Sequence, residues 1–271
     1  MMKNLTLIFF IFSLLSYSQN NFTSARSIEI SENNYEEQLR SSIVKNIELT
    51  NIGPSVMSGR VTDLEVNPNN PTEFYVAYAS GGLWHTKNNG TTFSPIMDNS
   101  MTQNIGDFAI DWKSNSIYVG TGESNSSRSS YPGIGILKSN DNGSTWTNIG
   151  LRDSHHISRV LVNPNNENHI VVAVIGHLYT KNTQRGIFTS FDNGQTWKKS
   201  LFINDNTGAI DLVVDPENFD IQYAASWERE RKAWNFVGSG DNSGIYKSID
   251  GGKNWELITT KSSGFPTGDG V

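Results

Sequence analysis

The sequence predicts an all-β protein made of four-stranded antiparallel blades, the building unit of a β-propeller. Three observations support this fold class. A short glycine-containing motif occurs four times at nearly constant spacing, the segments between its copies read as short strands and turns, and the composition is rich in aromatic residues and low in charge. Together they predict four blades that form part of a larger ring.

The repeated motif has the pattern [S/T]-x-[D/N]-x-G-x-[T/N]-[W/F]. Its copies begin at Thr86, Ser139, Ser190 and Ser248, so they lie 53, 51 and 58 residues apart. An Asp or Asn oxygen can accept backbone N–H groups within a tight turn, the glycine supplies a positive φ, and the aromatic residue anchors the next strand. We therefore interpret the acidic residues as turn formers and not as catalytic acids. The residues assigned this structural role are Asn88, Gly90, Asp141, Gly143, Trp146, Asp192, Gly194, Trp197, Asp250, Gly252 and Trp255.

Each unit between motifs reads as strand, turn, strand, loop, strand, motif turn and strand. The predicted blades span 60–97, 105–150, 157–203 and 209–258. Residues 46–53 resemble the outer strand at 145–150 and are expected to form an outer strand without a blade of its own. Residues 19–45 are expected to be a linker, with no long amphipathic helix, and residues 259–271 the start of a truncated fifth blade.

Residues 1–18 have the pattern of a secretory signal peptide. Lys3 precedes an apolar run from Leu5 to Leu15, and Ser16-Tyr17-Ser18 is a small-x-small cleavage site. The run is too short to span a bilayer. We therefore expect a secreted protein, extracellular or at the cell surface, with the periplasm as an alternative.

Charge and cysteine content exclude several classes of site. The net charge of -6, without clustered Lys and Arg, argues against a nucleic-acid partner. The absence of cysteine excludes disulfides, thiolate metal ligands and lipid attachment through cysteine. His85, His155, His156 and His177 show no metal-binding spacing, so neither a metal nor a cofactor is expected.

The motifs resemble a known family. The four glycine turns, Gly59-Arg60-Val61 and Gly81-Gly82-Leu83-Trp84 look like BNR/Asp-box propellers of the sortilin N-terminal-domain type, whose bacterial members are labelled glycosyl hydrolase-like. The resemblance covers about 47–258 and implies the fold. It does not imply one activity, because such propellers include sialidases, xyloglucan hydrolases, sorting receptors and assembly factors.

Two departures from those enzymes are evident. The Arg-Ile-Pro segment of sialidases is missing. Xyloglucan-cleaving relatives place a catalytic Asp before a Gly-Gly pair, whereas this chain has Ala79-Ser80-Gly81-Gly82. By resemblance, neither chemistry carries over.

One set of candidate functional residues recurs on the inner strands. Asp63, Asp107, Arg159 and Asp211 occupy matched positions and could line the central channel as acids or ligand groups. The alternative is that each Asp accepts backbone bonds from a neighbouring blade.

Two long loops supply the other candidates, because extra loop length often carries function. The loops are 121–131 and 227–236. Glu123 and Glu228, with Glu230, are candidate catalytic acids. The candidate ligand-binding residues are Arg128, Tyr131, Trp227, Arg229, Arg231 and Trp234. The alternative is a salt-bridged, aromatic plug between blades.

The sequence therefore favours an exported recognition or scaffold module that binds a protein or glycan at its loop face, alongside the remaining blades of a longer chain. The alternative is a glycoside hydrolase that uses loop or channel carboxylates.

Overall fold

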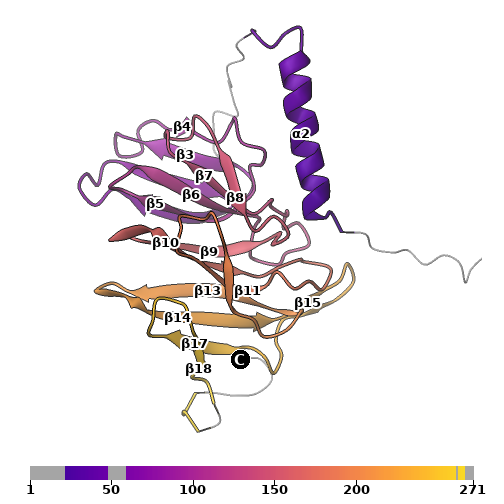
Figure 1. Ribbon diagram of the computed structural model, residues 1–271, viewed down its shortest axis with the longest axis vertical. Helices are drawn as coiled ribbons and strands as arrows, with labels where there is room; N and C mark the ends of the chain where they lie inside the picture. Colours follow the sequence, from indigo (N-terminus) through magenta and orange to yellow (C-terminus); the bar gives the residue numbers. More distant parts are fainter. Residues whose placement is uncertain (1–21, 48–58, 261, 266–271) are drawn as a thin grey trace, which may run out of the picture.

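The computed structural model describes residues 22–47, 59–260 and 262–265, and the fold in this part of the chain is nearly all β. Figure 1 shows four four-stranded antiparallel sheets stacked from the purple first sheet to the yellow fourth. The predicted fold class, a β-propeller of four-stranded antiparallel blades, is confirmed. The first sheet consists of β1 (Val61–Val66), β2 (Phe74–Tyr78), β3 (Gly82–Thr86) and β4 (Ser94–Pro95), and the second of β5 (Ile105–Asp111), β6 (Ser116–Thr121), β7 (Ile136–Ser139) and β8 (Thr147–Gly150). The third sheet consists of β9 (Ile157–Asn163), β10 (Asn166–Val174), β11 (Gly186–Ser190) and β12 (Lys198–Leu201). The fourth consists of β13 (Thr207–Asp215), β14 (Asn218–Glu228), β17 (Gly244–Ser248) and β18 (Glu256–Leu257).

Each sheet packs face to face on the next one along the chain. Three apolar clusters fill the spaces between consecutive sheets, centred on Phe108, Val172 and Leu212 respectively. Strand β6 is buried along its whole length. Burial on both faces explains why the inner strands of the second and third sheets, such as β6 and β10, carry continuous apolar runs.

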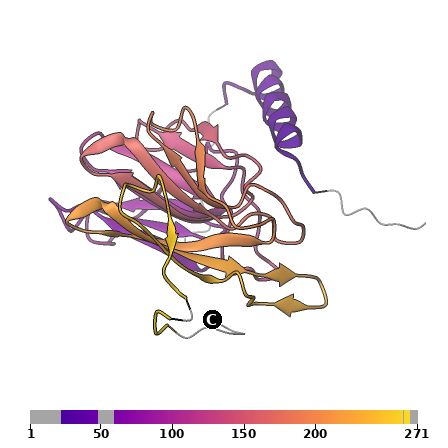
Figure 2. The ribbon, with the colours of Figure 1, turned by 60° about the horizontal axis from the view of Figure 1, so that its bottom comes forward.

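Antiparallel order divides the molecule into two ends. In every sheet the turns from first to second and from third to fourth strand lie at one end, which we call the turn end. The loops from second to third strand, and the connections to the next sheet, lie at the opposite end, which we call the loop end. The loop end is on the right in Figure 1. It includes a hairpin between β14 and β17, formed by β15 (Glu230–Arg231) and β16 (Phe236–Val237), which projects from the fourth sheet in Figure 2.

The repeated motifs form the third-to-fourth-strand turns of the turn end. In the third sheet, Asp192 Oδ1 accepts hydrogen bonds from Ser190 Oγ at 2.7 Å and from the backbone N–H of Thr196 at 2.8 Å. The N–H of Gly194 donates to Ser190 Oγ at 2.8 Å, and Gly194 has a φ of 84°. The side chain of Trp197 reaches the preceding sheet, where its Nε1 donates to Ile149 O at 2.8 Å. The motif therefore closes a turn and also docks one sheet on another.

A helix that was not predicted from the sequence occupies most of the predicted linker. Helix α2 (Ala25–Ser41) begins after Ser24, whose Oγ accepts the N–H of Ser27 at 3.2 Å. None of its residues is buried. Local propensity from Glu, Gln, Leu and Arg, together with this N-cap, accounts for it better than an apolar face does. No helix in the described ranges is long and apolar enough to cross a membrane.

The other predictions for the chain ends fall largely outside the described residues. Residues 1–18 lie there entirely, as does 48–53 of the predicted outer strand, while Asn46 and Ile47 form a turn and bend after the helix. The segment 259–271 is described only in part.

Candidate functional site

A pocket of about 600 Å³ opens at the loop end. Its wall comes from five segments: the residues before α2, the β6–β7 loop, the β8–β9 connection, the β10–β11 loop and the β15–β16 hairpin. Apart from the residues before α2, these segments are connected to the second, third and fourth sheets, so the stacking of the blades brings them together. Non-repeated loops that converge on one pocket are the usual place for a ligand in this kind of fold.

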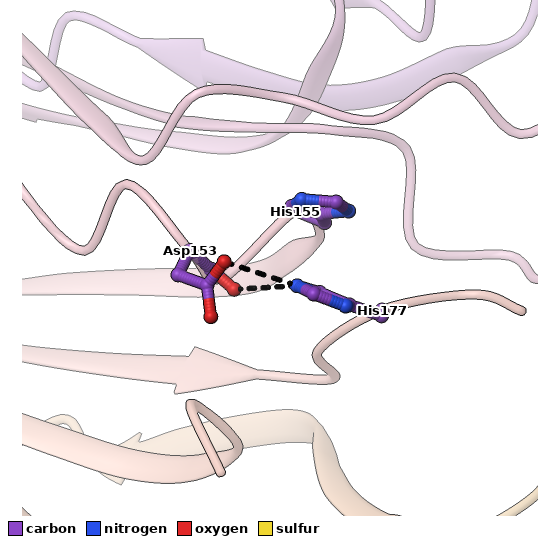
Figure 3. Close-up of side chains that lie close together, drawn as sticks. All are labelled: Asp153, His155 and His177. Atoms are coloured by element: carbon purple, nitrogen blue, oxygen red, sulfur yellow. Dashed lines mark hydrogen bonds and ion pairs between the residues drawn. The ribbon is translucent and has the colours of Figure 1, made fainter. Parts of the chain in front are cut away.

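A pair of stacked histidines forms one side of the pocket. The rings of His155 and His177 are 3.7 Å apart between centroids and nearly parallel, and the ring of Phe22 lies 4.7 Å from that of His177. Figure 3 shows Asp153 directed at the His177 ring. His177 Nε2 lies 3.1 Å from the carbonyl oxygen of Asp153 and 3.3 Å from its Oδ1, so this nitrogen carries the proton and donates. Burial lowers the pKa of His177 to about 4, aided by His155 and opposed by Asp153.

The same three residues are the candidate metal ligands of the described part of the chain. The donor atoms of Asp153, His155 and His177 all lie within 4.8 Å of one another. Two imidazoles and a carboxylate are ligands that zinc accepts. However, His177 already uses both ring nitrogens, since Thr180 Oγ1 lies 2.8 Å from its Nδ1. His155 Nε2 lies 2.9 Å from Thr23 O. A metal would have to displace bonds that hold the pocket wall, so the group acts as a polar network in this state.

Arg185 holds the β10–β11 loop in place. Its side chain is 1% exposed, and its Nη atoms donate to the carbonyl oxygens of Ile175 at 2.6 Å, His177 at 2.8 Å and Thr180 at 3.0 Å. Burial lowers the pKa of Arg185 to about 10. This arginine was not among the predicted site residues, because a single arginine before a strand carries no sequence signal.

The two predicted tryptophans, Trp234 and Trp227, differ in their position relative to the pocket. Trp234 lines the pocket and is 81% exposed. Trp227 donates its Nε1 to Gly238 O at 2.8 Å and lies beneath the hairpin. Tyr131 is exposed on the neighbouring β6–β7 loop, and Arg128 of that loop donates from Nε to Ala233 O at 2.9 Å, which joins the two predicted loops.

The predicted loop carboxylates are engaged within the protein. Glu123 is 2% exposed and accepts from Arg60 Nε at 2.6 Å, and its backbone oxygen lies 2.7 Å from His156 Nδ1. Glu228 Oε2 accepts from the backbone and side-chain nitrogens of Asn242, at 3.0 and 2.9 Å. Glu230 pairs with Lys232 at 3.0 Å. A general acid must reach the proton-accepting atom of a substrate, and Glu123 in particular does not face the pocket.

The inner-strand positions come together as a chain of charges. A register shift precedes each of them, between Val61 and Asp63 and likewise in the other three sheets, and such a bulge re-aims the side chain that follows. Arg159 lies between Asp107 and Asp211, with Nη1 3.2 Å from Asp107 Oδ1 and Nε 2.8 Å from Asp211 Oδ1. Asp107 Oδ2 also accepts the N–H of Val160 in the next sheet at 2.7 Å.

Burial dominates the electrostatics of Asp107 in this cluster. Burial raises the pKa of Asp107 well above its ordinary value, Asp63 adds to the effect, and Arg159 opposes it. Glu65, two residues after Asp63, has its pKa raised to about 7 by burial and by the charge of Asp63. Asp107 is 3% exposed, so it links blades and offers little access to a substrate, whereas the side chains of Arg159 and Asp211 are partly exposed.

Comparison with known proteins agrees with the fold. A model of the BNR/Asp-box repeat matches residues 188–199, which include the motif of the third sheet. No curated protein sequence matches the chain. Three solved structures are similar: an ancestral GH74 enzyme (22% identity, TM-score 0.56), a GH74 enzyme from Niastella koreensis (21%, 0.54) and the GH74 xyloglucanase from Xanthomonas campestris (16%, 0.51).

The extent of these matches is unequal. They cover 75%, 72% and 72% of this chain but only 24%, 29% and 29% of the three enzymes. The chain therefore spans between a quarter and a third of the length of these enzymes. At this level of identity the likeness concerns the fold.

Proposed function

We propose that this BNR/Asp-box β-propeller is an exported recognition module that binds a glycan chain in the loop-end pocket. The observation that carries the proposal is Trp234, a large aromatic side chain that is 81% exposed at the pocket mouth. Tyr179, in the pocket wall, and Tyr131, beside it, are also about half exposed. Exposed aromatic residues around a concave site mark a binding surface, and their flat faces suit a sugar ring. The GH74 neighbours, one of them a xyloglucanase, make a glycan a reasonable ligand class.

Binding is favoured over hydrolysis by the distribution of carboxylates. The described residues that line the pocket include no Asp or Glu. Glycoside hydrolysis commonly needs two carboxyl groups on either side of the scissile bond. Of the predicted loop acids, Glu123 is buried against Arg60 and Glu230 is paired with Lys232. The alternative, a glycoside hydrolase, requires acids from elsewhere in a longer protein.

Titration calorimetry with a panel of polysaccharide oligomers tests the proposal. We expect at least one oligomer to bind, and Trp234→Ala to weaken that binding about tenfold or more, as for an exposed aromatic anchor. Phe191→Ala is the matched control, because Phe191 is an exposed aromatic residue at the turn end. Equal loss in both variants, or none in Trp234→Ala, would contradict the proposal. Release of new reducing ends by the wild-type chain would instead support the hydrolase.

A further inference from the structure

Three arginine side chains converge beneath the β15–β16 hairpin. Arg229 lies between β14 and β15, and Arg231 is the second residue of β15. Arg185 approaches from the third sheet. Arg229 is 2% exposed, and burial together with the charges of Arg185 and Arg231 lowers its pKa to about 9, so it is still protonated at neutral pH.

These arginines lack ion-pair partners in the described part of the chain, although the charge of Asp205 acts on Arg185 from a longer distance. Within the described residues, no ion pair joins Arg185, Arg229 or Arg231 to an Asp or Glu. Arg229 makes one long hydrogen bond, from Nη1 to Leu178 O at 3.5 Å, and its Nε has no partner. Arg231 Nε is likewise buried without a partner, and its Cζ lies 4.5 Å from the Phe236 ring centre. A buried charge that lacks a counter-charge is strongly unfavourable, so an anion that arrives here is stabilised.

These charges act on the loop-end pocket. Arg231 and Lys232 belong to its wall, and Arg229 reaches Leu178, which also lines it. His156 lines the pocket too, and its pKa falls to about 3, chiefly through burial and then through the charge of Arg229. Of the acidic residues near the pocket, Asp153 is directed at His177 and Glu230 pairs with Lys232. The pocket thus has aromatic rings at its mouth and positive charge on one side, with no acid among its described lining residues.

We infer that the pocket contains a subsite for an oxyanion carried by the glycan, a carboxylate or sulfate group, which Arg231 contacts directly and Arg229 and Arg185 stabilise from behind. The inference rests on the recognition role proposed above and narrows it to acidic glycans. A guanidinium group binds carboxylate and sulfate oxygens through two parallel N–H bonds, which a lysine cannot reproduce. Trp234, three residues after Arg231, would then hold the sugar ring that carries the charge.

The experiment compares one ligand with and without its charge. Oligogalacturonate and the same oligomer after methyl esterification are titrated into the protein at low and at high salt. We expect the free acid to bind about tenfold or more tightly than the ester at low salt, and the preference to shrink at high salt. Dextran sulfate and neutral dextran oligomers form a second pair, which tells a sulfate site from a carboxylate site.

Variants assign the preference to the arginines. Arg231→Gln should remove most of the preference for the acid, and Arg231→Lys, which keeps the charge but not the planar fork, should restore only part of it. Lys198→Gln, which removes an exposed charge from β12, is the control and should keep the preference. Thermal melting establishes that each variant is folded. If Arg231→Gln does not fold, a reduced preference for the acid in Arg231→Lys, together with the salt series, tests whether Arg231 binds the oxyanion.

Two outcomes would overturn the inference, namely equal binding of acid and ester by the wild-type protein, or an unchanged preference in Arg231→Gln. If the ester binds as well as the acid and binding still requires Trp234, the recognition role stands and only the oxyanion subsite is wrong. If none of these oligomers binds, the subsite is wrong and the recognition role has to be decided with the wider panel.

Discussion

The turn end and the loop end of the molecule differ in how completely their polar side chains are hydrogen-bonded. At the turn end the carboxylates of the repeated motifs are fully used; Asp141, for example, accepts from Ser139 Oγ, Thr145 N and Thr145 Oγ1. Ten buried side-chain atoms in the described residues have no well-formed hydrogen bond, among them Asp153 Oδ1, whose 3.3 Å contact with His177 Nε2 is an ion-pair distance. Nine of them lie at the loop end, and Gln222 Oε1 alone lies at the turn end.

This contrast indicates a division of labour along the blades. The turn end repeats one solution four times and stabilises the stack, whereas the loop end differs from sheet to sheet and keeps polar groups in unfavourable surroundings. Unsatisfied groups concentrated at one end are expected where stability is given up for binding.

The largest expected loss of stability comes from substituting a motif glycine at the turn end. The glycine of the second motif, Gly143, has a φ of 84°, and a Cβ added there would lie 2.4 Å from Ile96 O of the preceding sheet. Gly143→Ala should therefore lower the free energy of unfolding by about 2–5 kcal/mol, through backbone strain plus the clash. Urea denaturation measures this.

The first motif provides the control for that clash. Gly90 has a φ of 78°, but an added Cβ would make only ordinary contacts, at 3.6 Å from Phe74 and 3.7 Å from Phe93. Gly90→Ala should cost about 1–2 kcal/mol, the strain alone. Equal losses in the two variants would mean that the motif glycine serves the turn and has no role in docking the sheets.

A second pair of variants tests whether the loop end gives up stability. Arg185 and Arg229 are both buried, but Arg185 donates to three carbonyl oxygens and Arg229 makes one long bond. Arg185→Met should destabilise the protein by about 2–4 kcal/mol, because it leaves buried carbonyls unpaired. Arg229→Met should stabilise it by about 1 kcal/mol, because it removes an uncompensated charge. Differential scanning calorimetry reads both, and a loss of stability in Arg229→Met would show that its charge is satisfied.

The two ends also differ in how far the sequence predicted them. The blades were predictable because the motif is local: Ser190, Asp192 and Gly194 bond to one another within a few residues, and so do their counterparts in the other copies. Aligning the inner strands on their turns predicted Asp63, Asp107, Arg159 and Asp211 as one set. The register shift before each of them explains why their side chains come together in the structure.

The pocket was harder to predict because its contacts are distant in sequence. His155 and His177 are stacked on each other, yet they lie in different loops and lack a metal-binding spacing. The segment at Phe22 and Thr23 joins them from before a helix that was taken for a linker. The sequence predicted Arg229, Arg231 and Trp234 as ligand-binding loop residues. That the two arginines form no ion pair with a carboxylate is visible only in the folded structure.

The last prediction uses the pH dependence of stability to distinguish the loop end from the turn end. The folded-state pKa of His156, at about 3, lies below the unfolded value of about 6.5, so folding binds fewer protons between these two values. Its contribution to stability is complete above pH 6.5 and is lost as the pH falls toward 3, which amounts to about 2 kcal/mol between pH 7 and 5. At the turn end, the pKa values of Asp141 and Asp192 are held below their usual 3.8 by hydrogen bonds, chiefly from the side chains of Thr145 and Thr196, so those carboxylates stay ionised at pH 5.

His156→Gln should therefore flatten the fall in unfolding free energy between pH 7 and 5, measured by urea denaturation at each pH. His169→Gln, at the turn end, should flatten it less, because the lowering of the pKa of His169 by burial is opposed by the carboxylate of Asp220. If the two variants had the same pH dependence, the loop end would be no more sensitive to acid than the turn end, and the contrast between them would rest on hydrogen bonding alone.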